Sequence, residues 1–134
     1  MMRQGIKRGF VGALAIGATL GAINWLPPDA DAKETRQARE IVLVAREMAF
    51  YLDGTDTANP TLRFRAGERV RIVLRNEEPG VIHNFAVPGW EVATRELYGT
   101  GSATLEFAVP GTRGRQEYRC TPHAWMMRGA IEVQ

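Results

Sequence analysis

The chain has 134 residues, which is room for one ordinary domain. Hydrophobic residues make up 45% and charged residues 24%, which is close to average soluble usage and argues against a disordered or collagen-like chain. The 17 Lys and Arg residues are nearly balanced by 15 Asp and Glu residues, so the chain is not a nucleic-acid binder that works by charge. One cysteine excludes an intramolecular disulfide, and two histidines exclude a large histidine-built metal cluster.

The order of residue types at the N-terminus is that of an export signal. A basic start is followed by an uncharged stretch over residues 10–26, and then by two prolines and the sequence Ala30-Asp31-Ala32. Small residues separated by one position are typical of a signal cleavage site. We therefore predict that residues 1–32 are an export signal that is cleaved after Ala32.

This N-terminal segment has one alternative interpretation. The uncharged stretch over residues 10–26 reaches the short end of the length that spans a bilayer, so it would anchor the chain in a membrane if it were not cleaved. We expect membrane attachment only in that case. After the signal we predict a polar leader over residues 33–39 and a single domain over residues 40–134.

Beyond the leader, alternation and turn signals predict β-strands. Val70, Ile72 and Leu74 alternate with arginines, which is the pattern of a half-buried strand with its apolar side toward the core. Gly and Pro turn signals separate the runs. The predicted strands cover residues 41–45, 48–52, 62–65, 69–75, 81–87, 103–109, 117–120 and 129–133, and residues 89–102 are predicted to form a short helix or a loop.

About eight short strands separated by such turns are typical of an all-β sandwich or barrel, and we predict a Greek-key arrangement. Several arginines alternate with the apolar positions of these strands, namely Arg63, Arg65, Arg69 and Arg71. We interpret them as a solvated outer face. The alternative is that they steer an acidic partner toward the protein.

The residues that carry chemistry gather near the C-terminus. Cys120, His123, Met126 and Met127 lie within one short segment, and His83 is the only other histidine of the chain. A soft thiolate with two imidazoles and a weak thioether is the ligand set of a blue-copper electron-transfer site. We therefore predict one copper ion bound by His83, Cys120, His123 and one of the two methionines.

The choice between the two methionines follows from strand geometry. Side chains alternate along a strand, and the apolar residues Ile131 and Val133 mark the core-facing parity of the last strand. Met127 has that parity, so we predict it as the axial ligand. Met126 is the reserve candidate.

These motifs resemble those of the small cupredoxins. The Cys-Thr-Pro-His sequence at 120–123 is similar to the loop of plastocyanin and pseudoazurin, whereas the Met-Arg-Gly sequence at 127–129 is more similar to azurin. The His-Asn pair at 83–84 resembles the upstream pair of both groups. The resemblance covers about residues 40–134, and the loop is a hybrid of the two loop lengths.

The resemblance also implies roles for the residues around the metal. Asn84 is implied to brace Thr121, the residue after the cysteine. His123 is implied to be the more exposed ligand, through which the electron leaves. The implied partners are redox proteins such as a cytochrome or a terminal oxidase or reductase in the periplasm or another exported compartment.

Two other functions would use some of the same residues. The same ligands would serve a carrier or chaperone that delivers Cu(I) in the periplasm, but few methionines remain once the signal is removed. Cys120 and His123 would suit a nucleophilic enzyme only with an orienting group, and the sequence shows none. The sequence therefore predicts an electron carrier rather than a catalyst, and gives no reason to expect an oligomer.

Overall fold

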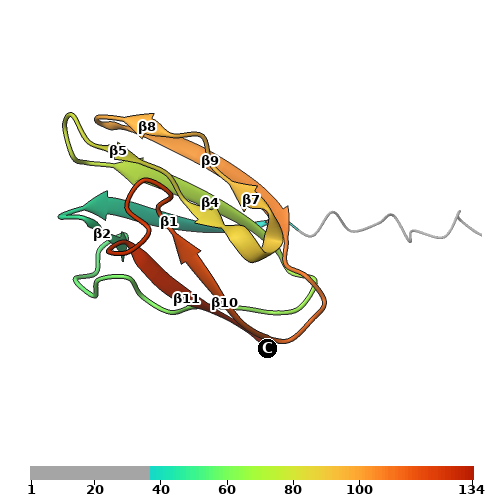
Figure 1. Cartoon of the computed structure of the whole chain (residues 1–134). Helices are drawn as coiled ribbons and strands as arrows, with labels where there is room; N and C mark the ends of the chain where they lie inside the picture. Colours follow the sequence, from blue (N-terminus) through green and yellow to red (C-terminus); the bar gives the residue numbers. More distant parts are fainter. Residues whose placement is uncertain (1–36) are drawn as a thin grey trace, which may run out of the picture. The chain divides into compact units, whose positions relative to one another are not determined.

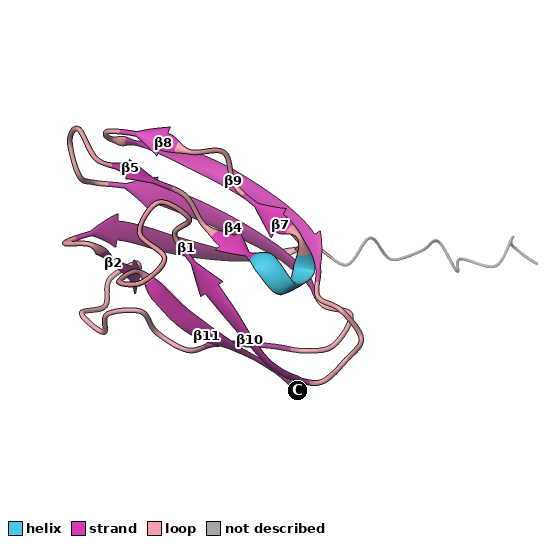
Figure 2. Cartoon of the chain, viewed as in Figure 1, coloured by secondary structure: helices cyan, strands magenta, loops and turns pink. Residues whose placement is uncertain are grey.

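The computed structural model describes residues 37–134, and the predicted export signal lies outside these residues. The described part is almost entirely β-structure, with one 3-10 turn, η1 (Pro88–Trp90), as its helical element (Figure 2). Across this part of the chain, no helix has the length and apolar character needed to cross a membrane. The strands are β1 (Arg39–Arg46), β2 (Ala49–Leu52), β3 (Leu62–Phe64), β4 (Arg69–Asn76), β5 (Ile82–His83), β6 (Ala86–Val87), β7 (Val92–Ala93), β8 (Leu97–Tyr98), β9 (Gly101–Ala108), β10 (Gly114–Arg119) and β11 (Arg128–Val133).

The strands form two main sheets and a short ribbon (Figure 1). One sheet has the order β2-β1-β4-β9, in which β1 and β4 run parallel. The other has the order β3-β11-β10-β6-β7, and β5 pairs only with β8 in the ribbon. The predicted all-β sandwich is confirmed.

The core lies between the two sheets and follows from the alternation along their strands. Val70 and Ile72 of β4 are fully buried, whereas Arg71 between them faces outward, as predicted. Aromatic rings join the two layers. The ring of Tyr118 on β10 lies 5.5 Å from that of Phe50 on β2.

Tyr118 is also tied to its surroundings by its hydroxyl group. The buried hydroxyl donates a hydrogen bond to the carbonyl of Pro60 at 2.6 Å. Gly129 lies directly opposite Tyr118 in the β10–β11 pair. An added Cβ at Gly129 would run into the ring and hydroxyl of Tyr118, so only glycine leaves room for this contact.

The predicted strand over residues 48–52 begins one residue too early. Glu47 and Met48 have φ angles of 53° and 56° and form the two-residue turn between β1 and β2. Two successive positive φ angles are the geometry of a tight hairpin turn whose twist matches its strands. Met48 is therefore half-buried in a turn, although it packs against the core as expected.

The predicted strand over residues 81–87 is wrong as a single element. It divides into β5 and β6, because β5 pairs with β8 while β6 pairs with β10 and β7. Between them, the side chains of Asn84 and Phe85 are both buried, which breaks the alternation. Residues 88–102 contain η1, β7, β8 and the start of β9, and the described residues form eleven strands rather than about eight.

Arg63 on β3 and Arg71 on β4 are both exposed, but the two strands belong to different sheets, so the outward arginines do not line the face of a single sheet. Arg63 pairs with Glu132 at 3.0 Å and Arg71 pairs with Glu40 at 3.4 Å, each across neighbouring strands. Exposed pairs of this kind contribute about 0–1 kcal/mol each. These pairs therefore add little to the stability of the fold.

Candidate metal centre

The loop between β10 and β11 begins and ends on residues that the sequence predicted as ligands. Cys120 directly follows β10 and Met127 directly precedes β11. The Cys120 N–H donates to the Met127 carbonyl at 2.9 Å, which closes the base of the loop. In Figure 1 this loop lies at the same end of the sandwich as the β1–β2 turn.

Backbone hydrogen bonds within the loop turn His123 back toward the cysteine. The His123 N–H donates to the Cys120 carbonyl at 3.2 Å. The N–H groups of Met126 and Met127 both donate to the His123 carbonyl at 2.9 Å. The loop is therefore a pair of successive tight turns, which fixes the backbone beneath both side chains.

His83 reaches the same place from β5. Its Nδ1 lies 3.7 Å from the Cys120 Sγ, and the Nδ1 of His123 lies 3.5 Å from the same sulfur. The three donor atoms all lie within 4.8 Å of one another. The structure thus brings together residues that are far apart in the sequence.

These distances fit a bound metal ion. Metal–sulfur and metal–nitrogen bonds of about 2.3 and 2.0–2.1 Å, at angles between tetrahedral and trigonal, put sulfur and nitrogen roughly 3.5–3.8 Å apart. The observed separations of 3.7 and 3.5 Å match that spacing closely. A thiol with two imidazoles is a donor set for soft or borderline ions such as copper and zinc.

The Cys120 sulfur lies in a buried environment, which favours a bound cation beside it. Cys120 and His83 are both fully buried, and His123 is half-buried. Burial raises the pKa of the Cys120 thiol, against the opposing effect of backbone hydrogen bonds from Asn84 and His123. The thiolate form of a buried cysteine is energetically unfavourable without a neighbouring positive charge. A bound metal ion would supply that charge.

The two methionines have opposite environments. Met127 is 0% exposed and belongs to the hydrophobic core, whereas Met126 is 41% exposed. The backbone of Met127 is bound to both Cys120 and His123. The buried methionine is the one that strand parity selected.

Asn84 and Thr121 meet as the resemblance implied. The Thr121 N–H donates to the Asn84 Oδ1 at 2.7 Å, and the Asn84 Nδ2 donates to the Thr121 Oγ1 at 3.1 Å. Asn84 is 5% exposed. Two hydrogen bonds from one side chain therefore tie the loop to the junction between β5 and β6.

Sequence reasoning missed one residue that touches a predicted ligand. The Oε2 of Glu78 lies 2.6 Å from the Nε2 of His83. Glu78 stands in a turn between β4 and β5, where a carboxylate looks like an ordinary surface residue. No periodicity in the sequence shows that this turn folds back over the histidine.

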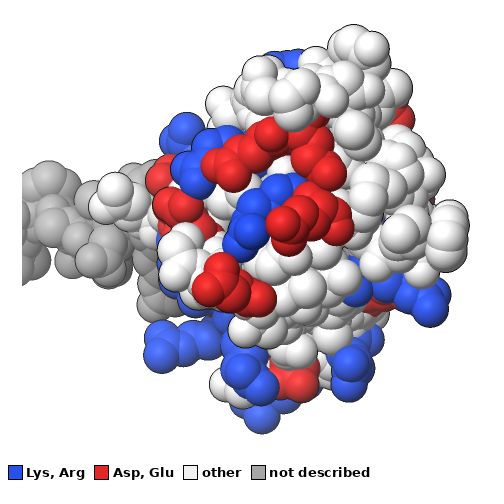
Figure 3. Space-filling model, turned by 90° about the vertical axis from the view of Figure 1, so that its left-hand side faces the viewer, with Lys and Arg blue, Asp and Glu red and all other residues white. Residues whose placement is uncertain are grey.

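The loop that carries the half-buried His123 presents apolar side chains to solvent. Among the described residues, the exposed large apolar side chains are Trp125 and Met126 in this loop, and Ile82 and Tyr98 on β5 and β8. Figure 3 looks at this end of the domain and shows a broad uncharged area beside a cluster of acidic and basic residues. Arg75 pairs with Asp53 at 2.6 Å and with Glu77 at 2.9 Å.

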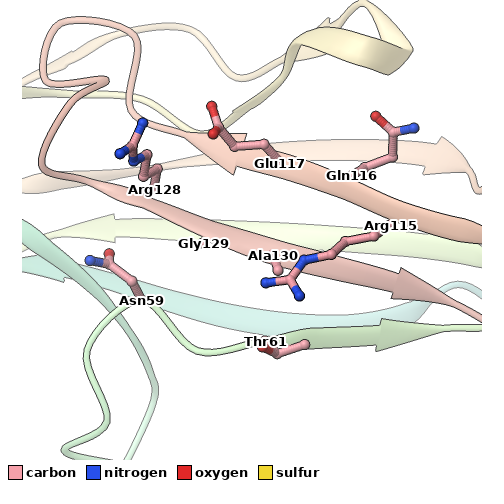
Figure 4. A pocket seen from close by; sticks show the side chains of 8 residues that line it. All are labelled: Asn59, Thr61, Arg115, Gln116, Glu117, Arg128, Gly129 and Ala130. Atoms are coloured by element: carbon pink, nitrogen blue, oxygen red, sulfur yellow. The ribbon is translucent and has the colours of Figure 1, made fainter.

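A separate polar hollow of about 560 Å³ lies on the outer face of β10 and β11. Figure 4 shows the side chains around it, including those of Arg115, Glu117 and Arg128. None of the predicted ligands lines it. The hollow therefore belongs to the outer surface of the sheet and plays no part in the candidate metal centre.

Comparison with known proteins agrees with this geometry. No protein-family model and no curated protein sequence matches the chain. Among solved structures, auracyanin A, a blue copper protein from the green thermophilic photosynthetic bacterium Chloroflexus aurantiacus, matches with a TM-score of 0.58 and 20% identity. The match covers 72% of this chain and 99% of that chain. This chain has the cupredoxin fold.

Other cupredoxin structures are similar to a comparable extent. Auracyanin B matches with a TM-score of 0.57 and 23% identity over 72% of this chain and 89% of that chain. A rusticyanin variant matches with a TM-score of 0.53 and 23% identity over 71% of this chain and 76% of that chain. A chain of a heme-copper terminal oxidase dimer matches with a TM-score of 0.57 and 16% identity, over 75% of this chain and 67% of that one.

Proposed function

We propose that this cupredoxin-fold chain is a mononuclear type 1 copper protein that passes single electrons between redox partners. The observation that carries the proposal is the cluster of His83, Cys120 and His123 donor atoms, all within 4.8 Å of one another. These three residues would hold the copper ion. Met127, buried beside them in the loop, is the proposed axial ligand.

The frame around the ligands supports electron transfer. Copper that alternates between Cu(I) and Cu(II) transfers electrons fastest when its ligands need not move. Here the loop is closed at its base by the Cys120–Met127 backbone hydrogen bond and braced by Asn84. These contacts do not depend on the charge of the metal, so they would hold the same geometry in both states.

Exposure indicates where the electron would leave. Of the three clustered ligands, His123 alone is not fully buried. Beside it, Trp125 is 77% exposed and Met126 is 41% exposed. An exposed apolar patch of this kind is typical of an interaction site, so we propose that the partner docks over His123.

The proposed partner is a redox protein such as a cytochrome or a terminal oxidase or reductase. A chain with this fold occurs in a heme-copper terminal oxidase dimer, which supports an oxidase as one class of partner. The export pattern of residues 1–32 supports an exported, periplasmic location. That segment lies outside the described residues, so the location rests on the sequence alone.

Burial also favours electron transfer over the other two functions. A copper carrier must release its ion to a partner, yet the side chains of His83, Cys120 and Met127 are all fully buried. A nucleophilic thiol must reach its substrate, and the Cys120 sulfur is covered. The buried site suits a group that exchanges electrons and keeps its metal.

The proposal is tested by cycling the copper-loaded protein between ascorbate and ferricyanide in the presence of a Cu(I) chelator. We expect the copper to remain bound through repeated cycles and the reduced protein to pass electrons to a cytochrome. Copper that moves to the chelator on reduction would contradict electron transfer and favour copper carriage. The Cys120→Ser variant is the matched control, because it lacks the proposed thiolate ligand and should not cycle.

A further inference from the structure

We propose that Glu78 is a positioning residue for the copper ligand His83 and that its carboxylate favours Cu(II) over Cu(I). This inference rests on the proposed function, because it assumes that copper binds at the cluster. Its starting point is a contact that lies on the far side of the histidine ring from the cysteine. The two ring nitrogens of His83 face different partners.

The geometry of the ring divides its two nitrogens between two tasks. The Nδ1 of His83 lies 3.7 Å from the Cys120 Sγ and faces the proposed metal position. The Nε2 lies 2.6 Å from the Oε2 of Glu78. The His83 side chain is 0% exposed and that of Glu78 is 22% exposed, so the contact is largely screened from water.

Hydrogen bonds hold the turn that carries Glu78, and this positions its carboxylate beside the ring of His83. The Glu78 N–H donates to the Asn76 Oδ1 at 2.9 Å. The side-chain Nδ2 of Asn76 donates to the carbonyls of Val81 at 2.9 Å and Leu97 at 3.3 Å. Asn76 is 1% exposed, so a buried polar group fixes the whole turn.

A second contact ties the carboxylate to the neighbouring hairpin. The N–H of Met48 donates to the Glu78 Oε2 at 3.4 Å. Met48 stands in the β1–β2 turn, where its positive φ angle of 56° belongs to the tight turn geometry. The carboxylate is therefore held between the hairpin and the histidine.

This arrangement has two chemical consequences. A carboxylate that accepts the Nε2–H keeps the proton on that nitrogen, which leaves the Nδ1 lone pair free for the metal and fixes the ring orientation. The negative charge also makes the imidazole a stronger donor. Because Cu(II) carries one more positive charge than Cu(I), the carboxylate stabilises the oxidised ion more and lowers the reduction potential.

The test compares three variants with the wild type. Glu78→Ala removes both the hydrogen bond and the charge, and Glu78→Gln keeps an oxygen that accepts the bond but removes the charge. Glu77→Gln is the matched control, since Glu77 is adjacent, carries the same charge and pairs with the exposed Arg75 instead. Urea unfolding of each copper-free variant separates loss of folding from loss of binding.

We expect Glu78→Ala to weaken Cu(II) binding about 10–100-fold, the usual range for removing such a partner of a metal-bound histidine. Cu(I) binding falls less, so the potential rises by about 59 mV for every tenfold difference between the two losses. Glu78→Gln regains part of the affinity and keeps the raised potential. Glu77→Gln matches the wild type in both measurements.

A readout that needs no copper completes the test. Nitrogen-edited proton NMR of the copper-free protein should show the His83 Nε2–H as a slowly exchanging proton in the wild type and in Glu77→Gln. The same signal is expected to vanish in Glu78→Ala. A wild type without this signal overturns the proposal, whatever metal it binds.

The outcomes with copper separate this proposal from the proposed function. A wild type that binds copper as a type 1 site, with Glu78→Ala and Glu78→Gln variants unchanged in affinity and potential, overturns the role of Glu78 alone. A wild type that forms no type 1 site overturns the proposed function and this inference together.

Discussion

Replacing Tyr118 with Phe removes one buried hydroxyl group and nothing else from the core. Tyr118 is 0% exposed, and its hydroxyl donates to the Pro60 carbonyl at 2.6 Å. The substitution leaves that buried carbonyl without its partner, which costs about 1–3 kcal/mol of unfolding free energy. We therefore expect Tyr118→Phe to lower the stability of the copper-free protein by that amount at pH 7.

The same substitution has a second, pH-dependent effect of opposite sign. Burial raises the pKa of the Tyr118 phenol above its ordinary value of 10.0. Above pH 10 the unfolded chain loses this proton while the folded chain keeps it, so the wild type loses stability as the pH rises. The contribution of Tyr118 is complete below pH 10 and declines by about 1 kcal/mol between pH 10 and 11.

The assay is urea unfolding of the wild type and Tyr118→Phe at pH 7, 9, 10 and 11. All other titrating groups are shared, so they cancel in the difference between the two proteins. We expect that difference to be constant from pH 7 to 9 and to shrink above pH 10. Two stability curves that stay parallel up to pH 11 would refute the reasoning, because they would show that the phenol titrates equally in both states.

Four further substitutions test the site and the strands around it. Met127→Leu should leave copper bound but change the reduction potential, which voltammetry measures. Met126→Leu should leave the potential unchanged. The reverse result would make Met126 the axial ligand. Gly129→Ala should destabilise the fold by about 1–3 kcal/mol in urea unfolding, because the new Cβ meets Tyr118; an unchanged midpoint would show that the ring moves freely. Asn84→Ala should speed copper loss to a chelator by freeing the loop, and an unchanged rate would leave Asn84 without a bracing role.

The parts of the fold that the sequence predicts well are those where burial alone decides the structure. In β4, Val70 and Ile72 face the core and Arg71 between them faces water, so the alternation in the sequence matches the alternation of buried and exposed side chains. The same parity argument selected Met127, which the structure buries, over the exposed Met126. The role of Met127 as a ligand stays a prediction.

The parts that the sequence does not predict are those where a side chain bonds to a distant segment. Residues 81–87 look like one strand, but Asn84 bonds to Thr121 and the chain changes its pairing partner there. Met48 looks like a strand residue, but in the structure it lies in the hairpin turn with a positive φ angle. Glu78 looks like a surface carboxylate, and only the folded turn brings it to His83.

The central claim, that Cys120 binds copper as a thiolate, is tested most directly by one absorption measurement. Cu(II) is added to the wild type and to Cys120→Ser, the visible spectrum is recorded, and ascorbate follows. The account predicts an intense thiolate-to-copper band in the wild type that bleaches on reduction, and no such band in the variant. A wild type that binds copper without colour, or a variant that keeps the band, would contradict it.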